Sequence, residues 1–182
     1  MTDTPLRFRN ATLDDVEAIV ALVDSAYRGD SSRAGWTTEA DMFDGRRTGA
    51  DEIVPWLQRE RACILLAERD NSEGAAELIA CAQVAVDDGD GYFGMFSVRP
   101  TLQGGGIGKR VLAEAERVAR DEWRVQCMRM TVFESRRELV DFYQRRGYCR
   151  TGIIKPFPYG DARFGVPKRE GLRFEVLEKR WI

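Results

Sequence analysis

Phe96-Ser-Val-Arg-Pro-Thr-Leu-Gln-Gly-Gly-Gly-Ile-Gly-Lys109 is the most informative stretch of the sequence. The apolar run Tyr92–Val98 enters it and is typical of a buried strand, and apolar residues at helical spacing follow from Ile107. A glycine-rich turn between a strand and a helix leaves backbone N–H groups unpaired at the positive end of the helix dipole. The stretch therefore predicts an anion site that is suited to a pyrophosphate.

Two common phosphate-binding motifs do not fit this stretch. A Walker A loop needs glycine where Gln103 stands and serine or threonine where Arg110 stands. A dinucleotide fingerprint that starts at Gly106 would need its third glycine at Val111. A third pattern, Q/R-x-x-G-x-G/A, is met by Gln103, Gly106 and Gly108.

On the N-terminal side of this stretch, the turn sequences DNSEG and DDGDG separate three apolar runs and indicate an antiparallel meander. Residues 7–10 are predicted to form a first strand, and a helix with one apolar face follows from Thr12 to Gly29. Two shorter helices are expected, one capped by Thr38 and one over residues 52–59. The three strands of the meander are Ala62–Ala67, Leu78–Val86 and Tyr92–Val98.

On the C-terminal side, the helix after the glycines leads to a predicted strand at Met128–Phe133. A strand–helix–strand unit needs a parallel pairing, so the sheet is expected to be mixed. A helix over residues 136–146 and strands at Tyr148–Ile154 and Leu172–Leu177 complete the chain. The fold class is therefore α/β, with a mixed, largely antiparallel sheet and flanking helices. Residues 1–182 contain no linker or repeat and are expected to form a single domain.

The composition excludes several classes of function. The chain has no histidine, which excludes Ser-His-Asp and Cys-His hydrolases and HExxH metal sites. The four cysteines form no CxxC pair, so no metal is expected, and Cys63, Cys81 and Cys127 are predicted to be buried thiols. The net charge of −2 favours neither nucleic acid nor membrane as a partner. No apolar run reaches the roughly 20 residues of a spanning helix, and a cytoplasmic protein is expected.

The glycine pattern and its surroundings resemble the GCN5-related N-acetyltransferase (GNAT) family. Ser97-Val-Arg-Pro100 precedes the loop, and the later segment FYQRRGY is similar to the usual ending of the family's signature. The resemblance covers the chain from Arg7 to Trp181, and two further segments resemble a subgroup for which no substrate can be given. It implies a GNAT fold and acetyl transfer from acetyl-CoA to a primary amine of a small molecule or peptide. A homodimer is a further expectation, since members of the family often form dimers.

The resemblance also implies which residues bind coenzyme A. In the family, the strand before the loop carries a bulge, diverges from the next parallel strand and hydrogen-bonds to the pantetheine arm. A backbone N–H near Val98 would polarise the thioester carbonyl. The cofactor's 3′-phosphate would meet arginines among Arg136, Arg137, Arg145 and Arg146. The pantetheine residues would be Phe96, Ser97 and Val98, and the pyrophosphate residues Gln103, Gly104, Gly105, Gly106, Ile107, Gly108 and Lys109.

Two catalytic residues are predicted. By resemblance, Tyr143 would protonate the departing thiolate, and the alternative is a core aromatic residue. Many members carry a glutamate base on the strand before the loop, but Phe93-Gly-Met-Phe96 has none. Glu134, at the end of the next strand, is the main candidate for the base, and the alternative is a solvated acid that caps a helix. Glu39 and Asp41 are weaker candidates.

The acceptor is expected between the first helix and the late loop, beside Tyr27, Trp36, Arg46, Arg47, Phe157 and Tyr159. The adjacent pair Arg46-Arg47 would suit a substrate carboxylate, although such pairs more often lie on a solvated surface. A non-catalytic acyl-CoA sensor with the same fold is the alternative function. The arginine runs point weakly to a nucleic-acid modifier, which the net charge opposes.

Overall fold

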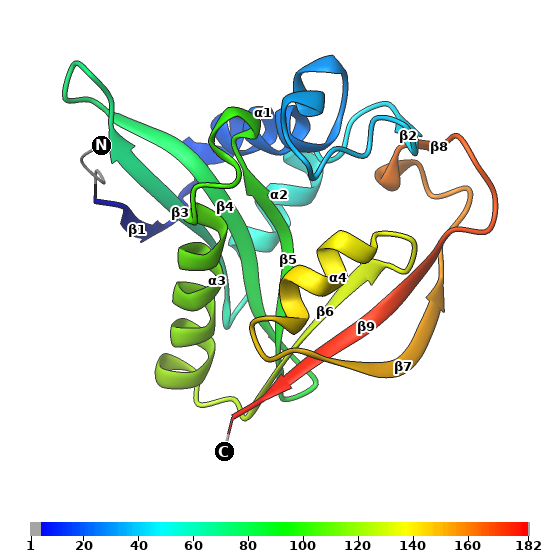
Figure 1. Cartoon of the computed structure of the whole chain (residues 1–182). Coiled ribbons are helices and arrows are strands. Elements are labelled where there is room, and N and C mark those ends of the chain that lie inside the picture. Colours follow the sequence, from blue (N-terminus) through cyan, green and yellow to red (C-terminus); the bar gives the residue numbers. More distant parts are fainter. Residues whose placement is uncertain (1–4, 182) are drawn as a thin grey trace.

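The computed structural model describes residues 5–181, which contain one large mixed sheet with helices on both faces (Figure 1). Two short strands, β2 (Phe43–Asp44) and β8 (Val166–Pro167), pair separately. The helices are α1 (Val16–Tyr27), α2 (Ala50–Leu57), α3 (Ile107–Arg117) and α4 (Arg137–Gln144). Across the large sheet the strands are β1 (Arg7–Asn10), β3 (Ala62–Asp70), β4 (Ala76–Asp87), β5 (Asp90–Val98), β6 (Cys127–Phe133), β9 (Arg173–Arg180) and β7 (Cys149–Pro156).

The central part of the sheet matches the predicted topology. Strands β3, β4 and β5 pair antiparallel, as the turn sequences indicate, and β5 pairs parallel with β6 across helix α3. The parallel register covers only Gly91 opposite Met128 and Tyr92 opposite Arg129. Beyond Tyr92, β6 continues to pair with β9 as far as Phe133, whereas β5 has left its neighbour. The two parallel strands therefore diverge towards their C-terminal ends.

Strand β5 also carries a bulge where it leaves β6. Its register with β4 shifts between Cys81 and Gln83, and Met95 has a φ of 45°, in the left-handed region that non-glycine residues rarely adopt. The bulge increases the local twist, and beyond it the end of β5 stays paired with β4 but not with β6. Both features expected before the glycine loop, the bulge and the divergence of the strands, are present.

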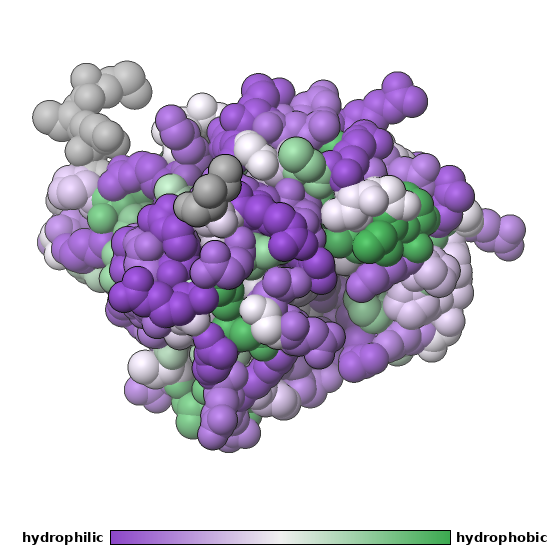
Figure 2. Space-filling view, turned by 90° about the horizontal axis from the view of Figure 1, so that it is seen from below, coloured by the Kyte–Doolittle hydropathy of each residue, from purple (hydrophilic) through white to green (hydrophobic). Residues whose placement is uncertain are grey.

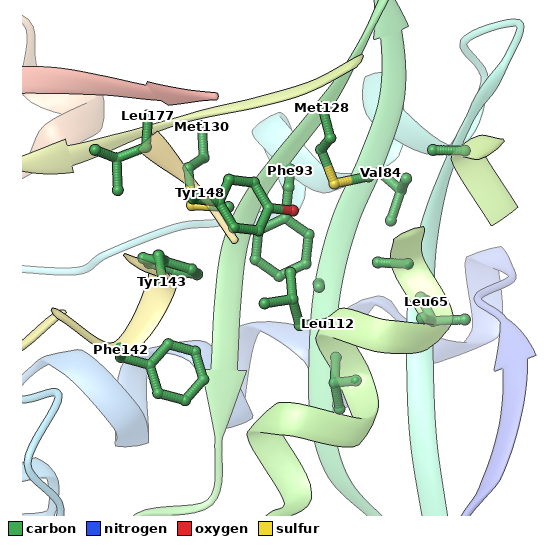
Figure 3. Close-up of a cluster of buried hydrophobic side chains, with 14 of the residues drawn as sticks. Leu65, Val84, Phe93, Leu112, Met128, Met130, Phe142, Tyr143, Tyr148 and Leu177 are labelled. Atoms are coloured by element: carbon green, nitrogen blue, oxygen red, sulfur yellow. The ribbon is translucent and has the colours of Figure 1, made fainter. Parts of the chain in front are cut away.

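Apolar side chains form a separate core on each face of the sheet. Strand β3 is a continuous apolar run because it is covered on both sides. Leu65 belongs to the core that includes residues of α3 and α4, while Ile64 and Leu66 belong to the core that includes residues of α1 and α2. Figure 3 shows the first core, with residues of α4 facing Phe93 of β5 and Leu112 of α3. Burying one such side chain contributes about 1.5–3 kcal/mol.

The surface is polar, apart from isolated patches. Figure 2 shows one face, which is mainly hydrophilic with hydrophobic residues in separate groups. Edge strand β7 is exposed along most of its length, and Ile153 and Ile154 are its exposed apolar residues. Cys63, Cys81 and Cys127 are buried as predicted, and Cys149 is exposed.

The predicted helix after Thr38 is wrong. The segment forms turns and then β2, and a 3-10 turn over Asp30–Ala34 precedes it. The Thr38 hydroxyl does not cap a helix, because it bonds to the Ser32 hydroxyl at 2.5 Å and accepts the Ala40 amide at 3.2 Å. The pairing of β2 with β8, more than 100 residues away, was not visible in the local pattern.

Candidate active site

A cavity of about 320 Å³ lies between the glycine loop, the end of β5 and helix α4. Its walls combine backbone of the glycine loop with aromatic side chains and, at one side, arginines. Such a concave site with few convergent polar groups is typical of a ligand pocket. Ten of the predicted site residues line it: Tyr27, Trp36, Phe96, Val98, Gln103, Gly104, Gly106, Gly108, Lys109 and Tyr143.

The glycines shape the loop for two different reasons. Gly104 and Gly106 have φ values of 87° and 83°, which a side chain would strain, although a Cβ at either would meet no atom within 4 Å. Gly108 lies in the first turn of α3, where a Cβ would stand 3.0 Å from the Phe96 ring. No side chain caps the N-terminus of α3 and no acid lies in its first turn. Its first amides are therefore available to an anion.

The Gln103 side chain forms hydrogen bonds within the protein. Its carbonyl oxygen accepts the amides of Trp36 and Thr37 at 2.9 and 3.4 Å. Its amide nitrogen donates to the Thr37 hydroxyl at 2.8 Å and to the Val98 carbonyl at 3.0 Å. Gln103 thus joins the glycine loop to the segment after α1, and its side chain is not free for a phosphate.

The end of β5 presents alternate residues to the cavity. Phe96 and Val98 line it, and the Tyr27 hydroxyl donates to the Phe96 carbonyl. Ser97 is buried on the other side of the strand, where its hydroxyl donates to the Met95 carbonyl at 3.3 Å. Only the backbone of Ser97 is therefore open to an interaction in the cavity.

Tyr143 lies at the inner end of the cavity and is 4% exposed. Its ring packs edge-on against Phe93, Phe142 and Tyr148, as the close-up of Figure 3 shows. Its hydroxyl makes no hydrogen bond to any residue in the range 5–181. Burial raises the pKa of Tyr143 well above its usual value, so the hydroxyl stays protonated at neutral pH.

The family is shown by comparison with known proteins. The model of the acetyltransferase (GNAT) family matches residues 22–148, which span the glycine loop and Tyr143. The chain belongs to the GNAT family. No curated protein matches it in a sequence search.

Solved structures of GNAT proteins share the fold over nearly the whole chain. A ribosomal-protein-alanine N-acetyltransferase from Brucella melitensis is 20% identical, with 96% of this chain and 99% of that chain covered and a TM-score of 0.69. An IAA acetyltransferase from Bacillus cereus is 15% identical, with 97% and 100% covered and a TM-score of 0.65. A GNAT family acetyltransferase from Elizabethkingia anophelis, with acetyl-CoA bound, is 15% identical, with 99% and 100% covered and a TM-score of 0.63. At these identities the likeness shows the fold.

Six predicted site residues of this GNAT protein do not line the cavity, namely Ser97, Gly105, Ile107, Glu134, Arg46 and Tyr159. Glu134 lines a different depression and forms an ion pair with Arg173 at 2.9 Å. The Glu134 amide donates to the Arg173 carbonyl, and this hydrogen bond holds Glu134 beside β9 after β6 has ended. Arg46 is paired with Asp51 at 2.8 Å on the surface. The Tyr159 hydroxyl joins the Arg169 carbonyl to the Leu172 amide, both at 3.0 Å, and so closes the late loop.

The predicted arginines divide between two roles. Arg145 and Arg146 line the cavity, and the Arg146 guanidinium stacks 3.6 Å from the centre of the Phe142 ring. Arg136 is buried and donates to the carbonyls of residues 36–38 at 3.0–3.4 Å. Arg137 lines the depression that holds Glu134. Two of the four arginines are thus placed to meet an anion in the cavity.

Sequence reasoning did not assign Leu139, Phe142 and Thr37 to the site. Leu139, Phe142 and Tyr143 of α4 and Arg146, two residues after its end, follow the spacing of one helix face, and all line the cavity. That spacing could have identified the α4 wall from the sequence alone. Gly105 and Ile107 do not line the cavity, and Ile107 packs against the core instead.

Proposed function

We propose that this GNAT protein transfers an acetyl group from acetyl-CoA to a primary amine of a small molecule or peptide. One observation carries the proposal. A single cavity extends from the open amides of α3 to the hydroxyl of Tyr143, along the bulged end of β5 where that strand has parted from β6. The cavity thus joins an anion site to a buried proton donor.

The residues of the cavity fit the parts of acetyl-CoA. The amides that follow Gly106 would hold the diphosphate, with Lys109 and Arg145 supplying positive charge. The backbone of Phe96 and Val98 would face the pantetheine arm at the free edge of β5. Apolar side chains of α4 would cover the arm and exclude water.

The proton balance of the transfer assigns a task to Tyr143. Bound acetyl-CoA supplies a thioester whose C–S bond breaks as the amine nitrogen forms the new bond to carbon. The attacking ammonium loses two protons, the thiolate takes one, and one proton is released. Tyr143 gives its hydroxyl proton to the thiolate and regains one from the nitrogen by way of solvent. Its raised pKa keeps that proton in place until the thiolate forms.

Binding of coenzyme A to the purified protein tests the proposal, with calorimetry as the measurement. We expect Gly106→Glu to abolish binding, because the new carboxylate would stand at the helix N-terminus. Gly74→Glu is the matched control, since Gly74 has a similar φ of 78° and equally open surroundings in a distant turn. Equal affinities of the two variants would contradict the proposal. Release of free thiol from acetyl-CoA is then measured with amino acids, polyamines, aminoglycosides and peptides.

A further inference from the structure

A second cavity, of about 430 Å³, lies on the opposite face of the sheet. Helix α2, strands β4 and β5 and the loop after β7 form its walls. Trp56 and Tyr92, whose ring centres are 5.8 Å apart, supply an aromatic side, and Gln83 and Met95 supply the floor. No residue of the proposed coenzyme A site lines this cavity.

The cavity contains a buried carboxylate oxygen that makes no hydrogen bond. Glu52 projects from α2, and its Oε1 atom is buried with no hydrogen bond to any residue from 5 to 181. Burial raises the pKa of Glu52. A buried oxygen of this kind is costly unless a partner compensates it, and native proteins contain few of them.

A cation without a hydrogen-bonded partner lines the same cavity. The Arg47 guanidinium makes no hydrogen bond or ion pair in the described part of the chain, and its contact is with the Tyr27 ring at 5.6 Å. The other charges of the cavity are already paired, because Arg163 binds Asp161 and Asp51 binds Arg46. One anion and one cation therefore remain for a ligand.

The two cavities flank β5 at its bulge. Met95 lines the second cavity, while the next residue, Phe96, lines the first. Tyr27 lines the first cavity, and Arg47 of the second stacks on its ring. Because β5 and β6 pair only at Gly91 and Tyr92, no ladder of hydrogen bonds closes the sheet beyond these residues. A ligand in the second cavity thus lies across one strand from a thioester in the first.

We propose that the second cavity binds the acceptor and that the acceptor is a free amino acid, with its carboxylate on Arg47 and its ammonium on Glu52. The inference rests on the proposed acetyl transfer and names its substrate class. A simple amine would leave the Arg47 guanidinium unused, and a simple acid would leave the Glu52 carboxylate without a partner. An amino acid satisfies both groups through charge-assisted hydrogen bonds.

Contact between Glu52 and the ammonium also explains how the ammonium is deprotonated to the neutral amine that attacks. At neutral pH only about one alkylamine in a few thousand is neutral. The ammonium passes one proton to the Glu52 carboxylate, which becomes a carboxylic acid, and the neutral amine then attacks the thioester. The acid later loses this proton to solvent, which accounts for the single proton released in the overall reaction.

The test compares the twenty standard amino acids with their carboxamides as acceptors, by thiol release from acetyl-CoA. We expect kcat/KM to be at least 10-fold higher for the preferred amino acid than for its amide. Arg47→Gln should remove this preference by lowering kcat/KM for the amino acid and not for its carboxamide. Arg120→Gln is the matched control, because Arg120 is paired with Asp121 on the surface, lines neither cavity and should leave the preference unchanged.

Glu52→Gln gives a second, independent readout. We expect it to lower kcat/KM for the acid and the amide by at least 10-fold, with an unchanged affinity for coenzyme A. The same change should not lower the melting temperature, because the Oε1 atom that it replaces makes no hydrogen bond. A residue with a merely structural role would lower the melting temperature and leave the kinetics of the folded protein intact.

Four outcomes decide the inference. A selective loss in Arg47→Gln and the loss of turnover in Glu52→Gln support it. The inference is overturned if coenzyme A binds but no amino acid binds the coenzyme-saturated protein in calorimetry. Equal turnover of acids and amides, or of polyamines, also overturns it while acetyl transfer stands. If coenzyme A itself does not bind, the proposed function fails and the substrate class falls with it.

Discussion

At the scale of single residues, the Tyr143 hydroxyl separates catalysis from binding. Tyr143→Phe keeps the ring between Phe93 and Tyr148 and removes an oxygen that has no hydrogen-bond partner among residues 5–181. Stability should therefore stay within about 0.5 kcal/mol. Loss of a general acid lowers kcat by about 100-fold. When both are measured on the same preparation, turnover should be reduced and the affinity for coenzyme A should be unchanged.

Tyr148→Phe is the matched control for this prediction. Tyr148 packs against Tyr143 in the same aromatic cluster, but it does not line the cavity. Removal of its hydroxyl should leave kcat unchanged. If both variants lost activity equally, the effect would come from packing of the aromatic cluster, and the acid role of Tyr143 would be wrong.

At the scale of elements, residues 36–38 are held between the glycine loop and the start of α4. Gln103 binds the segment from the loop, and Arg136 binds its carbonyls from α4. Gln103→Ala leaves the Trp36 amide and the Val98 carbonyl without this partner and should cost about 1–3 kcal/mol of folding free energy. The affinity for coenzyme A should fall as well, because Trp36 lines the cavity against Phe142.

Gly35→Ala tests the same contact from the other side. The backbone at Gly35 is extended, with φ −112° and ψ 163°, so alanine is allowed there. Its Cβ would stand 2.6 Å from the Gln103 side chain, which its four hydrogen bonds hold in place. We expect the same loss of stability and affinity as in Gln103→Ala, measured by urea unfolding and calorimetry. A double variant no worse than either single variant would show that both act through one contact.

The entry into α1 gives stability a defined pH dependence. Arg9 of β1 donates to both carboxylate oxygens of Asp15 at 2.8 Å and also pairs with Glu68 of β3. Hydrogen bonds from Arg9 lower the pKa of Asp15 from 3.8 to about 2. Because the folded-state pKa is depressed, the contribution is complete above about pH 4 and is lost as the pH falls towards 2.

Asp15→Asn measures this contribution. A shift of this size corresponds to about 2 kcal/mol in full, but the Arg9 side chain is 42% exposed and solvent weakens the pair. We expect a loss of about 1 kcal/mol at pH 7 that disappears near pH 2, in urea unfolding at several pH values. Asp14→Asn, next to it and exposed, should show no such convergence. A difference that persisted at pH 2 would assign the effect to the capping contacts of Asp15 with Thr12.

At the scale of the whole molecule, local patterns predicted the elements but not all of their partners. Turn sequences of five residues predicted the meander, and the glycine loop with its helix predicted the parallel pair, because both signals are local. The position of β9 between β6 and β7 is not encoded in such a pattern. This position depends on which strands can pack their apolar faces together once the chain has collapsed. The period of apolar residues within a strand does not indicate which neighbour the strand will have.

The same limit explains which site residues could be predicted. The glycines act through their own backbone, so their role is visible in a motif. Glu134 was the main candidate for the base because it follows a strand end. Its amide, however, donates to the Arg173 carbonyl of β9, and its carboxylate pairs with the Arg173 side chain. The Gln103 side chain accepts a hydrogen bond from the amide of Trp36, which is 67 residues away. Side-chain partners of this kind appear only when distant segments are brought together.

Coenzyme A binding should stabilise the whole chain, because its proposed site joins two halves of the sheet that pair over only two residues. The glycine loop follows β5 and helix α4 follows β6, so a ligand that contacts both ties the diverging strands together. At a concentration 100 times the Kd, a ligand that binds only the folded state adds about 2.7 kcal/mol. For a chain of this size the melting temperature should rise by about 5–10 °C, measured by scanning calorimetry. Tyr143→Phe should keep the full rise and Gly106→Glu should lose it. An equally large rise with pantetheine at the same concentration as coenzyme A would show that the glycine loop does not hold the diphosphate.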